Sequence, residues 1–504
     1  MRGLIRDPGP QGLEACVLPD RASRALPIQL LLAAAVAGLA YVVVIHLSGR
    51  ASAGIAAVVS SPLYFFGVTT ALAASLWAAW LLEIEPTSRS RAPFRIVMWA
   101  AILFRLIGLA APPVLSDDIH RYLWDGHVQR HGINPYAHAP ADPALDALST
   151  PGRGRINNPE LPTIYPPVSQ AVFLLVSFAP AGDISMKVVL ILFDLGTLLV
   201  LARILSHRGQ SPARVVIYAW SPLAVIEVGW SGHVDPVGVF LLVSAALAVI
   251  KKRSWLSMTL GALSGAAKYA GWLGMAPFVR RAGRRAFLAA PAAVALVYAP
   301  YAATGPDVVG SLPAYAERWR FNDSIFTLVL ELVERLRLDT LARKALLAAG
   351  GLDPSARPGD SLWLRLTEPL SLAKMLVGAL FLAYAVRILR RGWDDPIRES
   401  FALLAGALIL SPTLHPWYLL WILPFVALVP RLSWIWLSGA VLLFSYPDLI
   451  TRGPSEAPLR WLAWVEYVPF FVILGVESAR RRLWERDAVT PSGPLRAGVS
   501  AAQR

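Results

Sequence analysis

Two adjacent carboxylates, Asp117 and Asp118, stand in the segment SDDIHRYLWDG (116–126), directly after a long apolar run. Like charges close to a low-dielectric medium raise the pKa of one carboxyl group and leave the other ionised as a proton acceptor. The pair therefore predicts a general base where the chain leaves a membrane, although the start of a solvated loop could carry the same acids.

The neighbouring residues predict a short helix along the membrane interface. Asp118, Tyr122 and Asp125 fall on one helical face, with Arg121 and Trp124 beside them. We expect the aromatic side chains to face lipid and the acids to face a cavity, where Arg121 could steer a phosphate group.

Three further segments carry polar residues near helix ends. Lys268 interrupts the apolar run GALSGAAKYAGWLGMAPF, where a lysine costs several kcal/mol unless it reaches the interface or meets an anion. GHVDP (232–236) supplies His233 and Asp235, and SPTLHPWYLLW supplies His415. An anionic substrate group would explain Lys268, whereas a capped turn explains the other three equally well.

A metal site is a weaker alternative. His127 and His131 stand four residues apart, as zinc ligands on a helix do, but no acid of an HExxH motif accompanies them. Asp117 and Asp118 could instead bind a divalent ion together with a phosphate.

The composition places these residues in a membrane protein. Of 504 residues, 56% are hydrophobic and 16% are charged, whereas a soluble domain has about 25% charged residues. Recurrent apolar runs long enough to cross a bilayer predict an all-α polytopic membrane protein and exclude a β-barrel. The net charge of +14 comes from short basic clusters between these runs, not from the continuous basic face of a nucleic-acid-binding protein. The single cysteine, Cys16, excludes an intramolecular disulfide.

The basic clusters orient the predicted spans, because such clusters favour the cytoplasmic side. All of them fall inside if 167–181 only dips into the outer leaflet and 255–279 forms two half-helices with Lys268 near the outer turn. This membrane topology predicts about 13–14 transmembrane helices, with two large outer segments at 116–166 and 304–365. The candidate spans are 28–47, 62–82, 94–115, 186–205, 213–230, 235–250, 285–303, 366–390, 398–413, 416–430, 432–447 and 460–477.

The same membrane topology divides the chain into three parts. We expect a cytoplasmic N-terminal segment (1–27), a membrane domain (28–477) and a basic, disordered cytoplasmic tail (478–504).

An outward-facing base, a membrane cation and an apolar groove suit sugar transfer from a lipid phosphate. A phosphate leaving group needs charge neutralisation rather than a proton, so one carboxylate base for the acceptor hydroxyl suffices. A flippase or transporter of lipid-linked sugars or small solutes is the alternative. It would favour broken helices at the midplane and repeat symmetry, whereas the polar residues here gather at one face and no repeat is evident.

Six stretches of the chain carry a family resemblance. They are SDDIHRYLWDGHVQRHGINPY (116–136), INNPELPTIYPPV (156–168), GHVDP (232–236), the intramembrane Lys268, ERWRFNDSIF (317–326) and HPWYLLW (415–421). Over about residues 94–430 the chain resembles bacterial GT-C glycosyltransferases, in particular polyprenyl-phosphate-sugar-dependent enzymes akin to the mannosyltransferases of glycosyltransferase family 87 and PIG-M.

The resemblance implies a GT-C-like bundle whose active site lies at the outer face, where a lipid-phosphate donor enters from the membrane. It carries the catalytic acid over to Asp118, with Asp117 as its neighbour or as a metal ligand, and leaves open which of the two is the base. The donor-binding candidates are Lys268, Arg121, His233, Asp235, His415, Tyr165 and Arg320.

We therefore expect a glycosyltransferase of the bacterial plasma membrane with an extracytoplasmic site and both termini in the cytoplasm. The expected donor is a polyprenyl-phosphate monosaccharide, with mannose as the first candidate, and the expected acceptor is a cell-envelope glycan or glycolipid. No cofactor is required by this chemistry, although a divalent metal remains a candidate.

Overall fold

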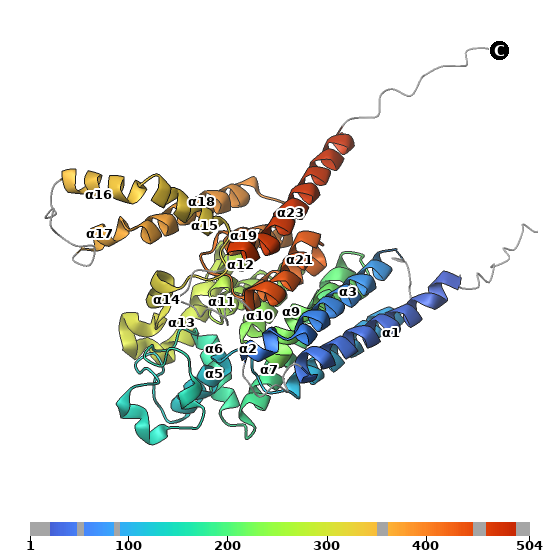
Figure 1. Ribbon diagram of the computed structural model, residues 1–504, viewed down its shortest axis with the longest axis horizontal. Coiled ribbons are helices and arrows are strands. Elements are labelled where there is room, and N and C mark those ends of the chain that lie inside the picture. Colours follow the sequence, from blue (N-terminus) through green and yellow to red (C-terminus); the bar gives the residue numbers. More distant parts are fainter. Residues whose placement is uncertain (1–20, 48–54, 85–90, 350–360, 447–459, 490–504) are drawn as a thin grey trace, which may run out of the picture.

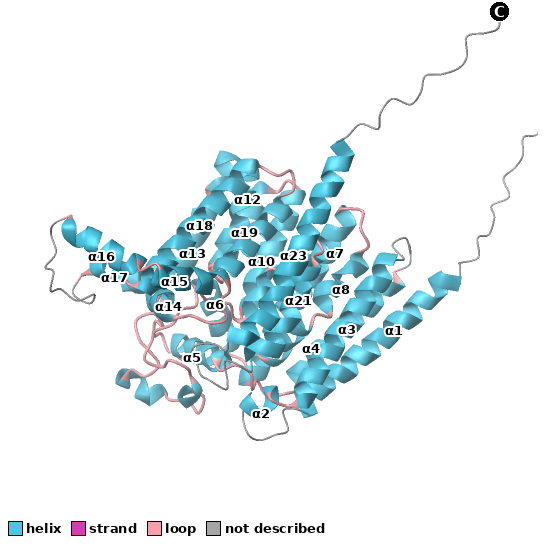
Figure 2. Ribbon diagram, turned by 45° about the horizontal axis from the view of Figure 1, so that its top comes forward, coloured by secondary structure: helices cyan, strands magenta, loops and turns pink. Residues whose placement is uncertain are grey.

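The computed structural model describes residues 21–47, 55–84, 91–349, 361–446 and 460–489. These residues form helices and connecting loops without a β-strand (Figures 1 and 2). Cys16 and the outer parts of the predicted terminal segments lie outside the described residues. The all-α class is confirmed.

The long and medium helices follow one another along the chain. They are α1 (Arg21–Val42), α3 (Pro62–Ile84), α4 (Ala92–Leu109), α5 (Asp118–Arg130), α6 (Pro167–Val176), α7 (Gly182–His207), α10 (Asp235–Ile250), α11 (Ser254–Gly265), α12 (Ala270–Phe287), α13 (Ala289–Tyr298), α15 (Ile325–Arg335), α16 (Leu338–Ala348), α18 (Pro369–Arg391), α19 (Pro396–Leu410), α21 (Leu432–Ala440) and α23 (Arg460–Val489).

Shorter helical pieces connect them. The α-helical pieces are α2 (Ile55–Val59), α8 (Val216–Ala219), α9 (Pro222–Ala224), α14 (Leu312–Arg318), α17 (Leu362–Leu366) and α20 (Leu423–Leu428). The 3-10 and π pieces are Val43–Leu47, Pro143–Leu148, Arg153–Arg155, Pro212–Val215, Val225–Trp230, Ala299–Val309, Pro416–Trp421 and Val441–Ser445.

Six of the described helices are long and apolar enough to cross a membrane, and a bent helix pair from Ala270 to Arg318 would add a seventh. The chain is therefore a multi-pass membrane protein. The six spans are Ala25–His46, Pro62–Glu83, Ala92–Leu109, Gly182–His207, Pro369–Arg391 and Leu462–Arg480.

Several other predicted spans are divided into short pieces. The predicted span 213–230 consists of four pieces, and 416–430 consists of two. Prolines such as Pro222 and Pro424 stand at these divisions, where a missing N–H and the pyrrolidine ring interrupt a helix. The count of about 13–14 helices thus stays a prediction, since length and composition support six or seven among the described residues.

The two predicted irregular segments have the expected form. Helix α6 has only ten residues, about 15 Å of helix, which is too short for a crossing. Helices α11 and α12 form a hairpin with Lys268 in the break between them. The start of α6 is attached to this break, because Val168 N–H and Ser169 Oγ donate to the carbonyl oxygens of Ala266 and Ala267.

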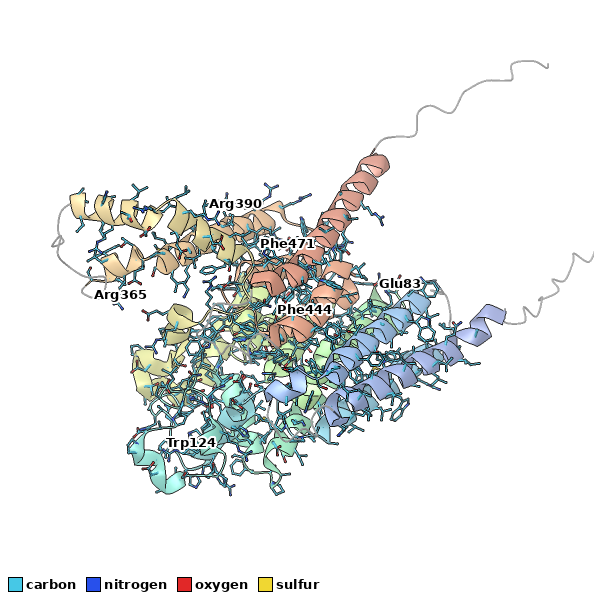
Figure 3. The ribbon with its side chains drawn as sticks, viewed as in Figure 1. Glu83, Trp124, Arg365, Arg390, Phe444 and Phe471 are labelled. Atoms are coloured by element: carbon cyan, nitrogen blue, oxygen red, sulfur yellow. The ribbon has the colours of Figure 1, made fainter. Side chains whose placement is uncertain are left out.

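Ion pairs bring together segments at one end of the bundle. Arg208 contacts Asp395 at 2.7 Å and Arg280 contacts Glu399 at 2.5 Å, and all four residues belong to segments predicted at the cytoplasmic end. Figure 3 shows Arg390 of that end far from Trp124 of the first outer segment. The contacts between these segments agree with the predicted membrane topology. Which compartment each end of the bundle faces stays a prediction.

The surroundings of α5 correct one expectation. Tyr122 and Trp124 do not face lipid, since both side chains are almost fully buried. Tyr122 stacks on Phe173 of α6 with 4.7 Å between ring centroids, and Trp124 packs against Leu145 and Ile156. The physical reason is that α6 packs on Tyr122, while the outer segment folds back over Trp124.

Two buried cations fix the end of α4, and thus the entry to α5. Arg105 pairs with Asp194 of α7 at 2.7 Å, and neither side chain is exposed. Lys187 Nζ donates to the carbonyl oxygens of Gly108, Leu109 and Ala111, at and just after the end of α4, where carbonyl groups lack regular helical partners. A cation at a helix C-terminus also interacts favourably with the helix dipole.

Arg105→Met should destabilise the protein by about 3–5 kcal/mol, because it leaves Asp194 as a buried charge without its cation. Denaturant unfolding of the purified protein in detergent would measure this. The double variant Arg105→Met/Asp194→Leu should recover most of the loss. Arg203→Met, which changes an exposed residue of α7, is the control. Wild-type stability of Arg105→Met would show that the ion pair does not hold α4 to α7.

Candidate active site

Asp118 is the first residue of α5, and each oxygen of its carboxylate has a polar neighbour. Oδ1 accepts a hydrogen bond from Nδ2 of Asn157 at 3.2 Å, and Oδ2 lies 3.8 Å from Nε2 of His233. The side chain keeps 19% of its exposure. It is thus both oriented and open to a substrate hydroxyl, as a general base must be.

Asp117 directly precedes α5 and makes no side-chain capping bond. Partial burial raises its pKa, and the charge of Asp118 raises it further, whereas His120 acts in the opposite direction. The two adjacent carboxyl groups therefore lie in unlike environments, and Asp118 is the one with a hydrogen bond from Asn157 and with His233 nearby.

His233 continues the row of polar groups into the protein. It is fully buried, and its Nδ1 lies 2.9 Å from Oε2 of Glu227, although the ring is not turned to donate along that line. The other carboxylate oxygen of Glu227 accepts from the Tyr446 hydroxyl at 2.7 Å. Asp118, His233 and Glu227 therefore form a continuous carboxylate–imidazole–carboxylate row.

The turn that presents His233 depends on glycine. Gly232 has a φ of +75°, and a Cβ there would meet the side chains of Ile119 and Lys187 at 3.0 Å. A larger residue would be strained in conformation and crowded in space.

A column of four stacked rings packs against this row. His233 stacks on Trp417 at 4.0 Å, Trp417 on His415 at 4.5 Å, and His415 on Phe321 at 4.9 Å, with 2–19° between ring planes. Three segments far apart in the sequence meet here, namely GHVDP, HPWYLLW and ERWRFNDSIF. Burial lowers the pKa of His415 to about 3, so its ring is neutral at physiological pH.

Lys268 stands beside the column as a partly exposed cation. Its Nζ lies 2.7 Å from Oδ2 of Asp235 and 5.3 Å from the ring centroid of Tyr418. Asp235 is fully buried, and its other oxygen accepts from Nε1 of Trp421 at 2.7 Å. Tyr418 links Lys268 to the column, because its ring centroid also lies 5.3 Å from that of His415.

Three predicted donor-binding residues have other surroundings. Arg121 donates to the carbonyl oxygens of Asn157, Asn158 and Leu161, so it holds the loop that carries Asn157.

Arg320 binds Asp323 and Thr327, and the structure does not bring its guanidinium into the cluster. Tyr165 is buried and packs edge-on against Tyr122, with 4.9 Å between ring centroids. Of the predicted residues, the structure thus brings together Asp117, Asp118, His233, Asp235, Lys268 and His415.

The sequence interpretation missed Asn157, Glu227 and Trp417. Glu227 had a recognisable signal, because an acid within the apolar run VIEVGW is expensive unless it has a function or a partner. Asn157 and Trp417 lay within motifs already noted, but their types alone do not show which side chain they contact.

The described residues contain no group of three or more His, Cys, Asp or Glu side chains that could hold a metal ion. His127 and His131 contact each other, and their ring nitrogens lie near the carbonyl oxygens of Leu148 and His127. A divalent ion at Asp117 and Asp118 would therefore need substrate oxygens to complete its ligand shell.

Two family models match the chain. The model described as alpha-(1->6)-mannopyranosyltransferase, N-terminal domain, matches residues 28–282, slightly more than half of the chain. The model of glycosyltransferase family 87 matches residues 163–412. No curated protein and no solved structure matches. Both family matches include His233, Asp235 and Lys268, and the first also includes Asp118.

His415 should make the protein sensitive to acid. The pKa of His415 is about 3 in the folded protein and about 6.5 in the unfolded chain. Between these pH values the unfolded chain therefore carries a proton on His415 that the folded protein lacks. Stability is therefore lost as the pH falls below about 6.5, by about 1.4 kcal/mol per pH unit. His415→Phe keeps an aromatic ring and should remove this slope in unfolding measurements between pH 6 and 4.

The control is His207→Phe, which changes an exposed histidine at the end of α7. It should keep the wild-type pH dependence. An unchanged slope in His415→Phe would contradict burial of a neutral ring at this position.

Proposed function

The chain belongs to the alpha-(1->6)-mannopyranosyltransferase family of GT-C-type glycosyltransferases, and we propose that its donor is polyprenyl-phosphate mannose. The observation that carries this proposal is that an accessible carboxylate, Asp118, and a partly exposed ammonium, Lys268, border one column of rings, Asp118 beside His233 and Lys268 beside Tyr418. A donor anchored in the bilayer can present its phosphosugar at such a site without leaving the membrane.

The proposed reaction is a direct displacement at the sugar. The acceptor hydroxyl forms a bond to the anomeric carbon, the bond from that carbon to the phosphate oxygen breaks, and Asp118 takes the hydroxyl proton. The polyprenyl phosphate leaves with its negative charge, which Lys268 neutralises. The leaving group needs no acid, so one carboxylate is sufficient for the proton transfer.

His233 and Glu227 serve as positioning residues for the base. The His233 imidazole lies beside the Asp118 carboxylate. A turn of its ring would let Nδ1–H donate to Glu227, which would then orient the imidazole, as outer carboxylates do for many catalytic histidines. The stacked Trp417 restricts rotation of the His233 ring.

The remaining parts of the proposal concern place and partners. The site lies on the extracytoplasmic face of a bacterial plasma membrane, with both termini in the cytoplasm, because the basic clusters gather at the opposite end. The acceptor is a cell-envelope glycan or glycolipid. A divalent ion held by Asp117, Asp118 and the donor phosphate is a candidate auxiliary group.

Asp118→Asn should lower the rate of transfer by about 10²–10⁴-fold, because the amide keeps the shape but cannot take a proton. Asp117→Asn should cost less. The assay follows labelled mannose from polyprenyl-phosphate mannose to acceptor in proteoliposomes, and donor binding should stay near the wild-type value. Asp146→Asn, which changes an exposed acid of the same outer segment, is the matched control.

Two results would change the assignment. Loss of transfer in Asp117→Asn with near-normal transfer in Asp118→Asn would make Asp117 the base. Near-normal transfer in both single variants and in the double variant would exclude a base at this position.

Lys268 is tested by changing it together with its partner. Lys268→Met alone would leave Asp235 as a buried unpaired charge and destabilise the protein, so the informative variant is Lys268→Met/Asp235→Asn. A lost charge-assisted hydrogen bond to the donor phosphate should weaken donor binding about 10- to 100-fold. Asp235→Asn alone keeps the cation and is the control. Unchanged donor affinity in the double variant would mean that Lys268 only pairs with Asp235.

A further inference from the structure

An open hollow lies at the end of the bundle opposite the candidate active site. It has a volume of about 690 Å³ and lies between the turn from α10 to α11 and the junction of α12 with α13. We call it the basic hollow, after Lys252, Arg253, Arg284 and Arg285. The other lining residues are Ser254, Trp255, Leu256, Ala282, Gly283 and Ala286.

Two left-handed backbone positions shape the basic hollow. Lys252 has a φ of +56° and closes the turn between α10 and α11. Gly283 has a φ of +74° and interrupts α12, and a Cβ at Gly283 would meet no atom within 4 Å. The space beside Gly283 is therefore open, and the kink turns Arg284 and Arg285 to the same side as the first turn.

The charge of the basic hollow is uncompensated. Within the described residues, none of its four cations has an acidic partner, whereas Arg280 and Arg281 of the same helix both contact Glu399. Orientation of the helices explains why cations lie at this end. It does not require four of them to surround one concave space that contains no carboxylate.

An apolar rim adjoins the cations. Trp255, Leu256, Phe287 and Leu288 are all at least 44% exposed, and each lies two or three residues after an arginine of the hollow. A ligand that matches both surfaces has an anionic head and apolar chains. A soluble nucleotide or an acidic peptide would leave the rim unused.

We propose that the basic hollow binds the phosphate headgroup of an anionic glycerophospholipid, with its acyl chains along the apolar rim. Basic pockets between membrane helices have the charge such headgroups need. Helices α10, α11 and α12 connect this site to the active site, since Asp235 begins α10 and Lys268 lies between α11 and α12. A bound lipid would hold together the ends of the helices that carry the Lys268–Asp235 pair.

Native mass spectrometry of the full chain in detergent tests this proposal. The protein is titrated with phosphatidylglycerol or phosphatidylcholine of identical acyl chains, and bound lipids are counted. Wild type should bind phosphatidylglycerol in preference, and Arg284→Gln/Arg285→Gln should weaken that binding by about 30-fold, the expected effect of two cations at a lipid surface. The matched control is Arg387→Gln/Arg390→Gln, which removes two exposed cations near the end of α18 and should behave as wild type.

Three results would overturn the proposal. They are equal binding of the two lipids, undiminished phosphatidylglycerol binding in Arg284→Gln/Arg285→Gln, and displacement of the lipid by an equal concentration of inorganic phosphate. The last would indicate a phosphate site that does not use the apolar rim. None of these results depends on sugar transfer, so the proposed function is tested separately.

Discussion

A charged group inside an apolar helix bundle must find a partner, because its desolvation costs several kcal/mol. Here the partners lie on different helices, so each pairing also fixes how the helices meet. Arg105 with Asp194 joins α4 to α7, and Lys187 joins α7 to the end of α4. These contacts determine where the chain leaves α4 and therefore where Asp118 is presented.

In the candidate active site, too, a buried charge needs a partner on another helical segment. Asp235 is buried and needs Lys268, and this need brings the break between α11 and α12 to the start of α10. Lys268 stays partly exposed while its partner is buried, which leaves one face of the ammonium available to an anion. Positioning of the helices and preparation of the site are thus achieved by the same ion pair.

The sequence predicted the helical class, the short α6, the hairpin around Lys268 and most of the cluster, because each depends on local patterns of apolar, basic and proline residues. The sequence-based prediction was wrong for side chains whose position depends on which distant residue they contact. Trp124 was expected at lipid but is covered by the returning outer segment. Arg121 was expected at a phosphate but binds backbone carbonyl oxygens. Such pairings depend on contacts between distant segments, which periodicity and charge do not specify.

The central claim is a direct displacement assisted by one base, and the configuration of the product tests it most directly. The measurement offers β-linked polyprenyl-phosphate mannose or a mannose nucleotide to the protein in proteoliposomes and determines the anomeric configuration of the product. A single displacement inverts that configuration, so we expect an α-linked product from the lipid donor and none from the nucleotide. A β-linked product, or transfer from the nucleotide, would contradict the account.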